Sequence, residues 1–426
     1  MAEVTRKLGL STTAIHGGAA PPTPGSGVTS PLVQSVNYVQ ETGTSEGLRY
    51  TRYGNTPNAE VIQRRLAQLE GSEAALVLSS GMGATACAML ALLRPGDHLI
   101  SSSWIYGGTR TLFTEDIIGM GIEVAFVNPL EPRAWRKALR KNTRVIFLES
   151  PVNPTCRVLE LNSLQSLAHS EGIALVVDST FASPVNFRPI EHGADVVIHS
   201  ATKYLNGHHD ILAGVVCGNE PFIDEVRRKM MVWGQAPDPF ACWLLERGLK
   251  TIDVRVKRQN ENAMRIAEWC AKRPEMAKVH YPGLPSHPDH EIAKTLLDGF
   301  GGMMAIELKG GGPAAVRFIH ALKLFTYAAS LGGVDSLVIE PRTNRNSGWV
   351  PQTEHRNRGR RRPDSRHRTG ASAVNDDPSH RSRQRIPALG HRSRAHQLSG
   401  QEGRVRLSHR TQWLRKDDNP QAPLHG

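Results

Sequence analysis

Between residue 74 and about residue 250, short β-rich runs alternate with stretches of helical pattern. The runs cover residues 74–78, 98–101, 123–127, 145–148, 174–177 and 196–199. Several of them are continuously apolar, which is typical of strands that are buried on both faces. Strands that alternate with helices predict an α/β fold with a mostly parallel sheet and helices on both of its sides. Ligands bind beyond the carboxyl ends of the strands in such a sheet, so the residues that follow the runs are candidates for a functional site.

The rest of the chain predicts a division into four parts. Residues 1–60 are rich in Pro, Gly and Thr and should form an extended arm. Residues 61–250 would then be the large domain, and residues 251–342 a smaller α+β domain. The character of the sequence changes at about Thr343, where a tail begins that runs to residue 426.

The tail carries nearly all of the net charge of +12. Residues 343–426 hold 17 Arg, one Lys and seven acids, which leaves the preceding residues at +1. The tail has no Phe or Tyr and only two Trp. Such a segment buries too little apolar surface to offset its ordering entropy, which predicts disorder. An Arg-rich tail can attract nucleic acid electrostatically, but it lacks interleaved aromatic residues for base stacking, so we expect no nucleic-acid partner.

Composition also argues against several classes of protein. The longest apolar stretch, near residues 86–93, is far shorter than the roughly 20 residues of a membrane helix. The first residues lack the apolar core of a signal peptide. Five scattered Cys without a C-x-x-C pair do not form a disulfide framework or a thiolate metal site. We therefore expect a cytoplasmic protein with no metal and no membrane contact.

Two strand ends carry residues with chemical potential. Lys203 follows a buried run that ends at Ser200, where partial desolvation would favour a nucleophilic or basic role. Ser200 and Thr202 add hydroxyls that suit a phosphate. Asp178 ends another apolar run and could pair with a protonated ring nitrogen. Taken singly, a surface lysine and an N-cap aspartate are the plainer interpretations.

Three further segments follow strands. Gly81 and Met82 lie in a small-residue loop that opens a helix, so backbone N–H groups could bind an anion, although a tight turn gives the same pattern. Tyr106 could stack on a planar ring or relay a proton, or be a core aromatic. Asn153 could bind a ring substituent, or belong to a plain Asn-Pro turn. Together with a lysine and an aspartate, this set predicts pyridoxal phosphate as the cofactor.

Five ordered motifs resemble the Cys/Met-metabolism family of pyridoxal-phosphate enzymes. The family includes cystathionine γ-synthase, cystathionine lyases, methionine γ-lyase and O-acylhomoserine sulfhydrylase. The motifs are Tyr50-Thr-Arg52-Tyr-Gly-Asn55, Ser80-Gly-Met82-Gly-Ala, Asp178-Ser-Thr180-Phe, His199-Ser-Ala-Thr-Lys203-Tyr-Leu-Asn-Gly-His and Ser330-Leu-Gly-Gly-Val. The resemblance covers about residues 8–342 and implies the fold type I of pyridoxal-phosphate transferases.

The resemblance also implies a role for each matching residue. Lys203 would bind the cofactor as a Schiff base and shuttle protons, and Asp178 would hold the pyridinium nitrogen. Tyr106 would stack on the ring and assist proton transfer. The remaining implied contacts are with the phosphate (Gly81, Met82, Ser200 and Thr202), the ring hydroxyl (Asn153), the substrate carboxylate (Ser330) and the phosphate of a neighbouring subunit (Tyr50 and Arg52).

The family's reaction and assembly follow from the same resemblance. We expect a transsulfuration enzyme that acts at the γ carbon of a homoserine-derived amino acid. Asp335 follows the Ser330 motif, as an acid, often Glu, does in synthase and cystathionine-lyase members, although Asp335 is shorter and could equally be a solvated loop acid. The resemblance favours formation of cystathionine from an O-acylhomoserine and cysteine. Cystathionine or methionine γ-lyase and O-acylhomoserine sulfhydrylase are the alternatives. A site shared between subunits implies a homo-oligomer, by the family's habit a tetramer.

The C-terminal part departs from the family. Members continue past the Ser330 motif with an Arg-Leu-Ser-Val-Gly strand whose Arg binds the substrate α-carboxylate. After Arg342 nothing matches at that distance, so the small domain is expected to be incomplete. Arg406-Leu-Ser lies too far along the chain and is expected to lack the strand context, so no such Arg is assigned. Two hypotheses follow: a frame-shifted reading from near residue 343, and a chain that binds cofactor but is catalytically impaired.

Overall fold

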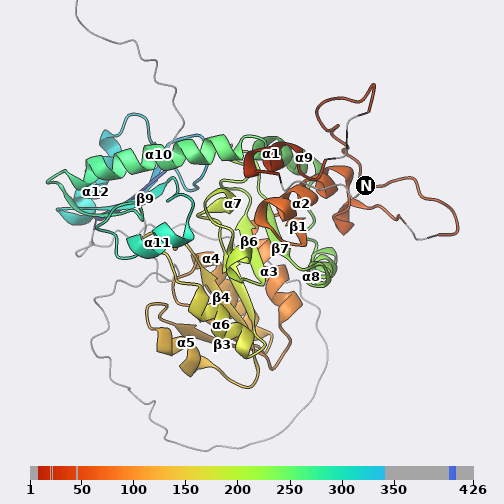
Figure 1. The fold of residues 1–426 in the computed structure, drawn as a ribbon, viewed down its shortest axis with the longest axis horizontal. Coiled ribbons are helices and arrows are strands. Elements are labelled where there is room, and N and C mark those ends of the chain that lie inside the picture. The colour runs from red at the N-terminus through yellow and green to blue at the C-terminus, as the bar shows by residue number, and fades with distance from the viewer. Residues whose placement is uncertain (1–7, 20, 22, 45–46, 341–402, 409–426) are drawn as a thin grey trace, which may run out of the picture. The chain divides into compact units, whose positions relative to one another are not determined.

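The larger of two sheets has seven strands in the order β1-β7-β6-β5-β4-β2-β3. The structure is a computed structural model that describes residues 8–19, 21, 23–44 and 47–340 and the backbone of residues 403–408 (Figure 1). The strands are β1 Ala74–Leu78, β2 His98–Ser102, β3 Glu123–Val127, β4 Thr143–Glu149, β5 Ala174–Asp178, β6 Val196–Ser200 and β7 Gly214–Gly218. All neighbours are parallel except β7, which runs antiparallel to β1 and β6. The predicted mostly parallel sheet is confirmed, whereas β7 was not anticipated.

Both faces of this sheet are covered, which explains the continuous apolar runs. In β1, Ala75 and Val77 join one apolar cluster while Leu76 and Leu78 join a second one on the other face. The first cluster includes residues of α2 (Pro57–Glu70), α6 (Asn162–Ser170) and α9 (Pro239–Leu249), and the second includes residues of α3 (Gly81–Leu92) and α8 (Glu220–Trp233). A strand that contacts helices on both faces has no solvent-facing position for polar side chains.

The helices that precede and follow these strands begin at well-formed caps. Thr56, Ser80, Asn219 and Asp238 each accept a backbone N–H from the first turn of α2, α3, α8 and α9, which satisfies donors that a helix start leaves unpaired. The helices are α1 Leu10–His16, α2 Pro57–Glu70, α3 Gly81–Leu92, α4 Gly107–Thr111, α5 Pro132–Ala138, α6 Asn162–Ser170, α7 Ser183–Asn186, α8 Glu220–Trp233 and α9 Pro239–Leu249. A π-helical segment, Leu112–Ile117, continues α4, and 3₁₀ turns cover Thr51–Tyr53 and Pro189–His192.

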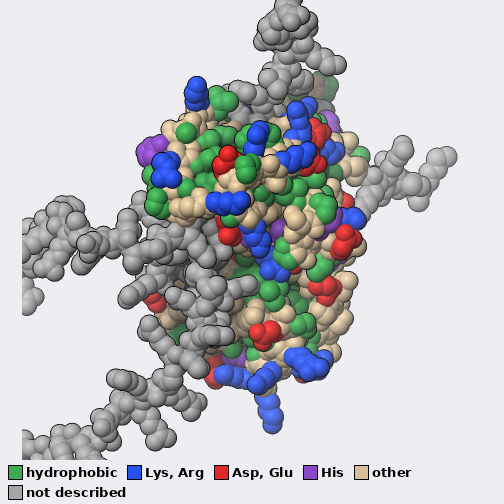
Figure 2. Space-filling model, turned by 90° about the vertical axis from the view of Figure 1, so that its left-hand side faces the viewer, with side chains coloured by type: hydrophobic (Ala, Val, Ile, Leu, Met, Phe, Trp, Pro, Cys, Tyr) green, Lys and Arg blue, Asp and Glu red, His purple; other side chains and the backbone are tan. Residues whose placement is uncertain are grey.

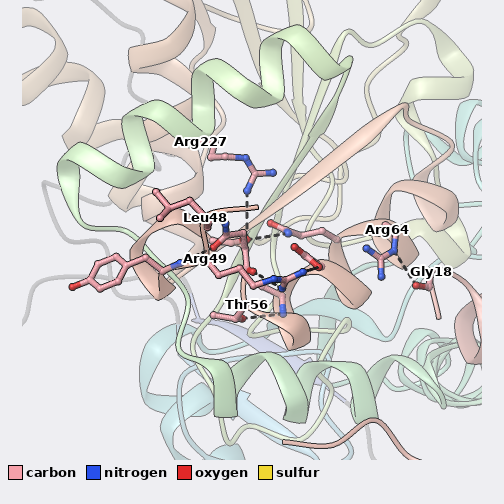
Figure 3. Close-up of polar contacts among 12 residues, drawn as sticks. Gly18, Leu48, Arg49, Thr56, Arg64 and Arg227 are labelled. Carbon is pink, nitrogen blue, oxygen red and sulfur yellow. Dashed lines mark hydrogen bonds and ion pairs between the residues drawn. The ribbon is translucent and has the colours of Figure 1, made fainter. Parts of the chain in front are cut away.

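The segment before α2 is held in place by arginines that bind backbone carbonyls (Figure 3). Arg49 donates to the carbonyl of Asn55 at 2.9 Å and forms an ion pair with Glu60 of α2 at 2.9 Å. Arg227 of α8 donates to the carbonyl of Gly54, and Arg64 of α2 donates to that of Gly18. These contacts fix the part of the arm next to Tyr50 and Arg52.

A second sheet has five strands in the order β10-β11-β12-β9-β8. Its strands are β8 Met276–His280, β9 Met303–Leu308, β10 Thr326–Tyr327, β11 Leu337–Ile339 and β12 Gly403–Ser408, and its helices are α10 Ile252–Ala271, α11 His290–Leu296 and α12 Gly311–Ala321. An apolar cluster between this sheet and α10 and α12 contains Ala263, Ile306 and Ala315. The long helix α10 lies beside α1 at one end and beside β8 and β9 at the other (Figure 1).

The place of β12 corrects two expectations about the C-terminal segment. β12 runs antiparallel between β9 and β11, with Arg406 opposite Ala305 on one side and Ile339 on the other. The prediction of disorder is therefore wrong for residues 403–408, and Arg406-Leu-Ser does have a strand context. Backbone pairing on both edges outweighs the composition that suggested disorder, because a central strand satisfies its N–H and C=O groups in two ladders. The other residues of the tail lie outside the described part of the chain.

The charge of the described surface is mixed. Figure 2 shows Lys and Arg side chains interspersed with acidic and apolar ones on one face of the molecule. This agrees with the net charge of +1 left for the residues before Thr343. Within the residues that the structure describes, no helix has the length and apolarity needed to cross a membrane.

The register of β11 and β12 predicts that residues 343–402 are dispensable for folding. Their deletion leaves residues 340–342 and 403–405 between the paired residues Ile339 and Arg406, enough to connect two antiparallel strands. The melting temperature should stay within about 3 °C of the full chain, since a change of 1 kcal/mol corresponds to roughly 2–4 °C. Differential scanning calorimetry measures it.

Truncation after residue 342 is the matched comparison, since it removes β12 as well. Each lost backbone hydrogen bond is worth about 0.5–1.5 kcal/mol, so the free energy of unfolding should fall by several kcal/mol. Equal melting temperatures for the two variants would show that β12 does not contribute to the sheet.

Candidate functional site

Three adjacent parallel strands bring their carboxyl ends to one edge of the large sheet. Glu149 at the end of β4 is registered with Asp178 at the end of β5. Asp178 is in turn registered with Ile198 of β6, which ends at Ser200, and the N–H of Lys203 donates to the carbonyl of Ser200 at 3.1 Å. Residues separated by 54 positions in the chain are therefore neighbours, as the alternation of strands and helices predicted.

Thr180 holds the end of β5 against the end of β6. Oδ1 of Asp178 accepts hydrogen bonds from the backbone N–H of Thr180 at 3.0 Å and from its hydroxyl at 2.6 Å. The Thr180 hydroxyl oxygen also accepts the N–H of Ser200 at 2.8 Å. Burial raises the pKa of Asp178, while the Thr180 hydrogen bonds and the nearby His199 lower it in part. The carboxylate is oriented but incompletely compensated, a state that favours binding of a cation or an N–H donor.

Lys203 lies next to a cavity that contains residues of the Ser330 motif. Nζ of Lys203 donates to Oγ of Ser330 at 3.2 Å. The cavity, of about 530 Å³, is lined by Ser330, Thr202, Asp335 and His209 among others. Its volume suits a small polar molecule, and it joins the large domain to the loop between β10 and β11.

His209 is a polar residue of this cavity wall that sequence reasoning passed over. Both of its ring nitrogens are buried and have no hydrogen-bond partner among the described residues. Burial lowers the pKa of His209, Asp335 opposes that shift, and Lys203 adds to it. The imidazole therefore remains neutral at pH 7, so His209 adds no positive charge beside Lys203.

The first turn of α3 forms a small-residue cradle beside Ser200. A methyl group added at Gly81 would lie 2.8 Å from Cβ and 2.9 Å from Oγ of Ser200, so only glycine fits there. The N–H groups of Gly81 and Met82 fall in the first turn, where a helix offers them no acceptor. Together with the Ser200 hydroxyl, they provide donors for an anion at a positive helix end.

The predicted aromatic and amide residues lie on two loops that share one anchor. Tyr106, 51% exposed, precedes α4, and a methyl group at Gly108 would touch both the Tyr106 ring at 2.7 Å and the Met82 sulfur at 3.1 Å. The backbone N–H groups of Tyr106 and Asn153 both donate to the carboxylate of Glu149. Sequence reasoning missed Glu149, although an acid at the end of a continuous apolar strand was a usable signal.

Three predicted residues have other contacts. The Thr202 hydroxyl already accepts the N–H of Ala213 at 3.1 Å, so its role toward a phosphate remains a prediction. Tyr50 and Arg52 contact each other in the arm, with the Arg52 guanidinium 5.7 Å from the Tyr50 ring centre. Tyr50 also packs edge-on against Tyr53. The role of the pair toward a second subunit likewise remains a prediction.

Comparison with known proteins agrees with this arrangement. A family model described as Cys/Met metabolism PLP-dependent enzyme matches residues 11–362. L-methionine gamma-lyase of Fusobacterium nucleatum subsp. polymorphum is 38% identical over 361 residues, which cover 82% of this chain and 91% of that protein. A probable cystathionine gamma-synthase of Herpetosiphon aurantiacus is 41% identical over 318 residues, which cover 74% and 99%. A crystal structure of metB from Corynebacterium glutamicum has a TM-score of 0.77 at 36% identity and covers 80% of this chain and 89% of that one.

The described residues fit pyridoxal phosphate. The cradle at Gly81, which a Cβ would fill, suits the phosphate, and Lys203 is within reach of the same strand end. Asp178 keeps Oδ2 clear of the two hydrogen bonds that Thr180 makes to Oδ1. A carboxylate oxygen in that state matches a pyridinium N–H donor. The half-exposed Tyr106 supplies an aromatic face next to Met82.

Substitution of Asp178 by Asn should affect stability and cofactor binding in opposite directions. The folded pKa of Asp178 is raised, so its ionised form opposes folding above its ordinary pKa of about 4. Asp178→Asn should therefore raise the free energy of unfolding of the cofactor-free protein at pH 7, and this gain should vanish as the pH falls toward 4. Urea unfolding at several pH values measures it.

The same variant should bind pyridoxal phosphate about ten- to hundredfold more weakly, because a hydrogen bond to a charged group is worth roughly 1.5–3 kcal/mol. Asp195→Asn, which changes an acid between β5 and β6 that accepts the N–H of Leu175, should bind within threefold of wild type. Wild-type affinity in Asp178→Asn would contradict the assignment.

Proposed function

The chain belongs to the Cys/Met-metabolism pyridoxal-phosphate enzymes, and from that premise we propose that it acts as a cystathionine γ-synthase. In this reaction the γ-substituent of an O-acylhomoserine leaves as a carboxylate, and the thiol sulfur of cysteine takes its place at Cγ. Pyridoxal phosphate, when bound, serves as an electron sink that stabilises negative charge at the substrate α carbon. Enzymes of sulfur amino-acid metabolism in this family share that cofactor.

The observation that carries the proposal is the cavity beside Lys203. It places the Ser330 hydroxyl near the lysine amine and the Asp335 carboxylate in the same wall. A carboxylate in a cavity favours a substrate with a positive charge away from the reacting carbon. Cysteine and cystathionine carry such a distal ammonium group, whereas methionine does not.

The candidate site residues have complementary tasks in this proposal. Lys203 removes the α-proton of the substrate and returns protons later, which requires a neutral amine for part of the cycle. The Ser330 hydroxyl orients that amine through their hydrogen bond. When pyridoxal phosphate is bound, Asp178 would hold its pyridinium nitrogen and Tyr106 would stack on its ring. Gly81, Met82, Ser200 and Thr202 would hold the phosphate, and Asn153 would meet the ring hydroxyl.

Elimination is the second candidate reaction. The relative from Fusobacterium nucleatum is an L-methionine gamma-lyase, and a lyase would release a 2-oxo acid and ammonia from the same substrate class. Methionine has no ammonium group distant from the reacting carbon. In γ-elimination of methionine, Asp335 would therefore have no positively charged group of the substrate to bind. Asp335 therefore favours replacement with cysteine over γ-elimination of methionine or a sulfhydrylase reaction.

Assembly into a cytoplasmic homo-oligomer with shared sites completes the proposal. The arm that carries Tyr50 and Arg52 also exposes large apolar side chains, among them Val28, Val36 and Val39. Exposed apolar residues on an extended segment are typical of an interface. All five cysteines are buried and none of them forms a disulfide, which suits a reducing compartment.

Product analysis tests the reaction type. Purified protein with pyridoxal phosphate should convert O-succinylhomoserine and cysteine to cystathionine, and this rate should exceed 2-oxobutyrate release from methionine at least tenfold. Asp335→Asn should lower kcat/KM for cysteine about tenfold, the loss of one charged contact, and leave methionine elimination within threefold. Faster elimination than replacement would overturn the synthase proposal in favour of a lyase.

A further inference from the structure

A buried carboxylate that the proposed reaction does not use lies beside Asp178. Glu149 ends β4, is 4% exposed and is registered with Asp178 on the neighbouring strand. Two acids at adjacent positions of a sheet repel one another, and burial of an ionised carboxylate is costly unless hydrogen bonds compensate it. Glu149 must therefore have strong donors.

Those donors come from the two loops that carry the ring-binding residues. Oε2 of Glu149 accepts the backbone N–H of Tyr106 at 2.7 Å, and Oε1 accepts the backbone N–H of Asn153 at 3.0 Å. Tyr106 follows β2, whereas Asn153 follows β4. One side chain thus joins two loops from different parts of the chain at the residues that face the cofactor.

The Tyr106 loop has few other constraints. Its side chain is 51% exposed, so core packing does not fix it. Tyr106 is the residue that precedes the first turn of α4, with φ −53° and ψ 140°, and its side chain does not cap that helix. Because it precedes the helix, its N–H lies outside the helical hydrogen-bond pattern. The bond to Glu149 therefore sets the position from which the ring projects.

Only a carboxylate provides this arrangement. An ionised carboxylate is acceptor-only and offers lone pairs on both oxygens, so it can accept two N–H groups from two directions. A glutamine of the same shape offers one oxygen and an NH₂ group, which would face an N–H donor with another donor. The isosteric change therefore removes one bond and makes that contact repulsive.

We propose that Glu149 is the positioning residue of the cofactor site, which holds Tyr106 and Asn153 in register with the ring plane through their backbone N–H groups. The proposal rests on the function proposed above for those two residues. Glu149 itself contacts no reacting atom in this scheme. Its substitution should loosen the two loops together even when no cofactor is bound.

Amide hydrogen exchange of the cofactor-free protein tests the positioning directly. Glu149→Gln should accelerate exchange at least tenfold in the peptides that contain Tyr106 and Asn153, with both loops affected. Asp253→Asn is the matched control, because Asp253 is a buried acid of α10 that accepts the Ser11 hydroxyl and contacts Lys257. It should leave exchange in both loops unchanged. Wild-type exchange at Tyr106 and Asn153 in Glu149→Gln would overturn the proposal.

Cofactor titration provides the second readout. Glu149→Gln should bind pyridoxal phosphate about ten- to hundredfold more weakly and shift its visible absorbance band, whereas Asp253→Asn should match wild type. Affinity within threefold of wild type and an unshifted band would also overturn the positioning role. Absence of any visible band in the wild-type protein would reject the proposed function instead, and the exchange experiment would still decide the role of Glu149.

A shorter acid keeps the test usable if Glu149→Gln does not fold. Glu149→Asp retains both acceptor oxygens and the charge but is one methylene shorter, so it reaches one loop well and the other poorly. Exchange should then rise in one of the two loops, and cofactor affinity should fall less than in Glu149→Gln. Wild-type exchange in both loops would contradict the proposal.

Discussion

The site depends on the lateral pairing of β4, β5 and β6, which end together at one edge of the large sheet. This pairing places the carboxylates of Glu149 and Asp178 side by side, an arrangement that is unfavourable unless each acid has its own donors. Backbone N–H groups of two loops compensate Glu149, and Thr180 compensates Asp178 in part. The hydrogen bonds that offset the repulsion between the two acids therefore also fix the positions of Tyr106, Asn153 and Thr180.

The same edge is completed by elements that are distant along the chain. β7 returns antiparallel between β1 and β6, so the helix that follows β1 begins next to the end of β6. That is why Gly81 approaches Ser200 so closely that a side chain would not fit. Ser330 then approaches Lys203 from the segment before β11, so the cavity has one wall from the loop between β6 and β7 and one from the segment that runs from β10 to β11.

Sequence patterns were most informative for features that depend on a short stretch of the chain, such as strands and the residues at their ends. Continuous apolar runs predicted six strands of the large sheet, and strand ends pointed to Lys203, Asp178 and Ser200. They did not reveal β7, whose run is short and rich in Gly, nor Glu149, whose meaning depends on two loops elsewhere in the chain. β12 was rejected for its position along the chain, yet register in a sheet depends on spatial neighbours and not on sequence separation.

The sequence by itself determined the class of fold and the family, and it predicted the roles of Lys203 and Asp178. Periodicity and motif spacing are local properties of the sequence, so they can be recognised without knowledge of the fold. Only the tertiary structure decided which donors satisfy each buried acid, that Ser330 and Asp335 line a cavity next to Lys203, and that a strand separated from β11 by 63 residues lies between β11 and β9 in the smaller sheet. Those features arise from contacts between segments that no local pattern connects.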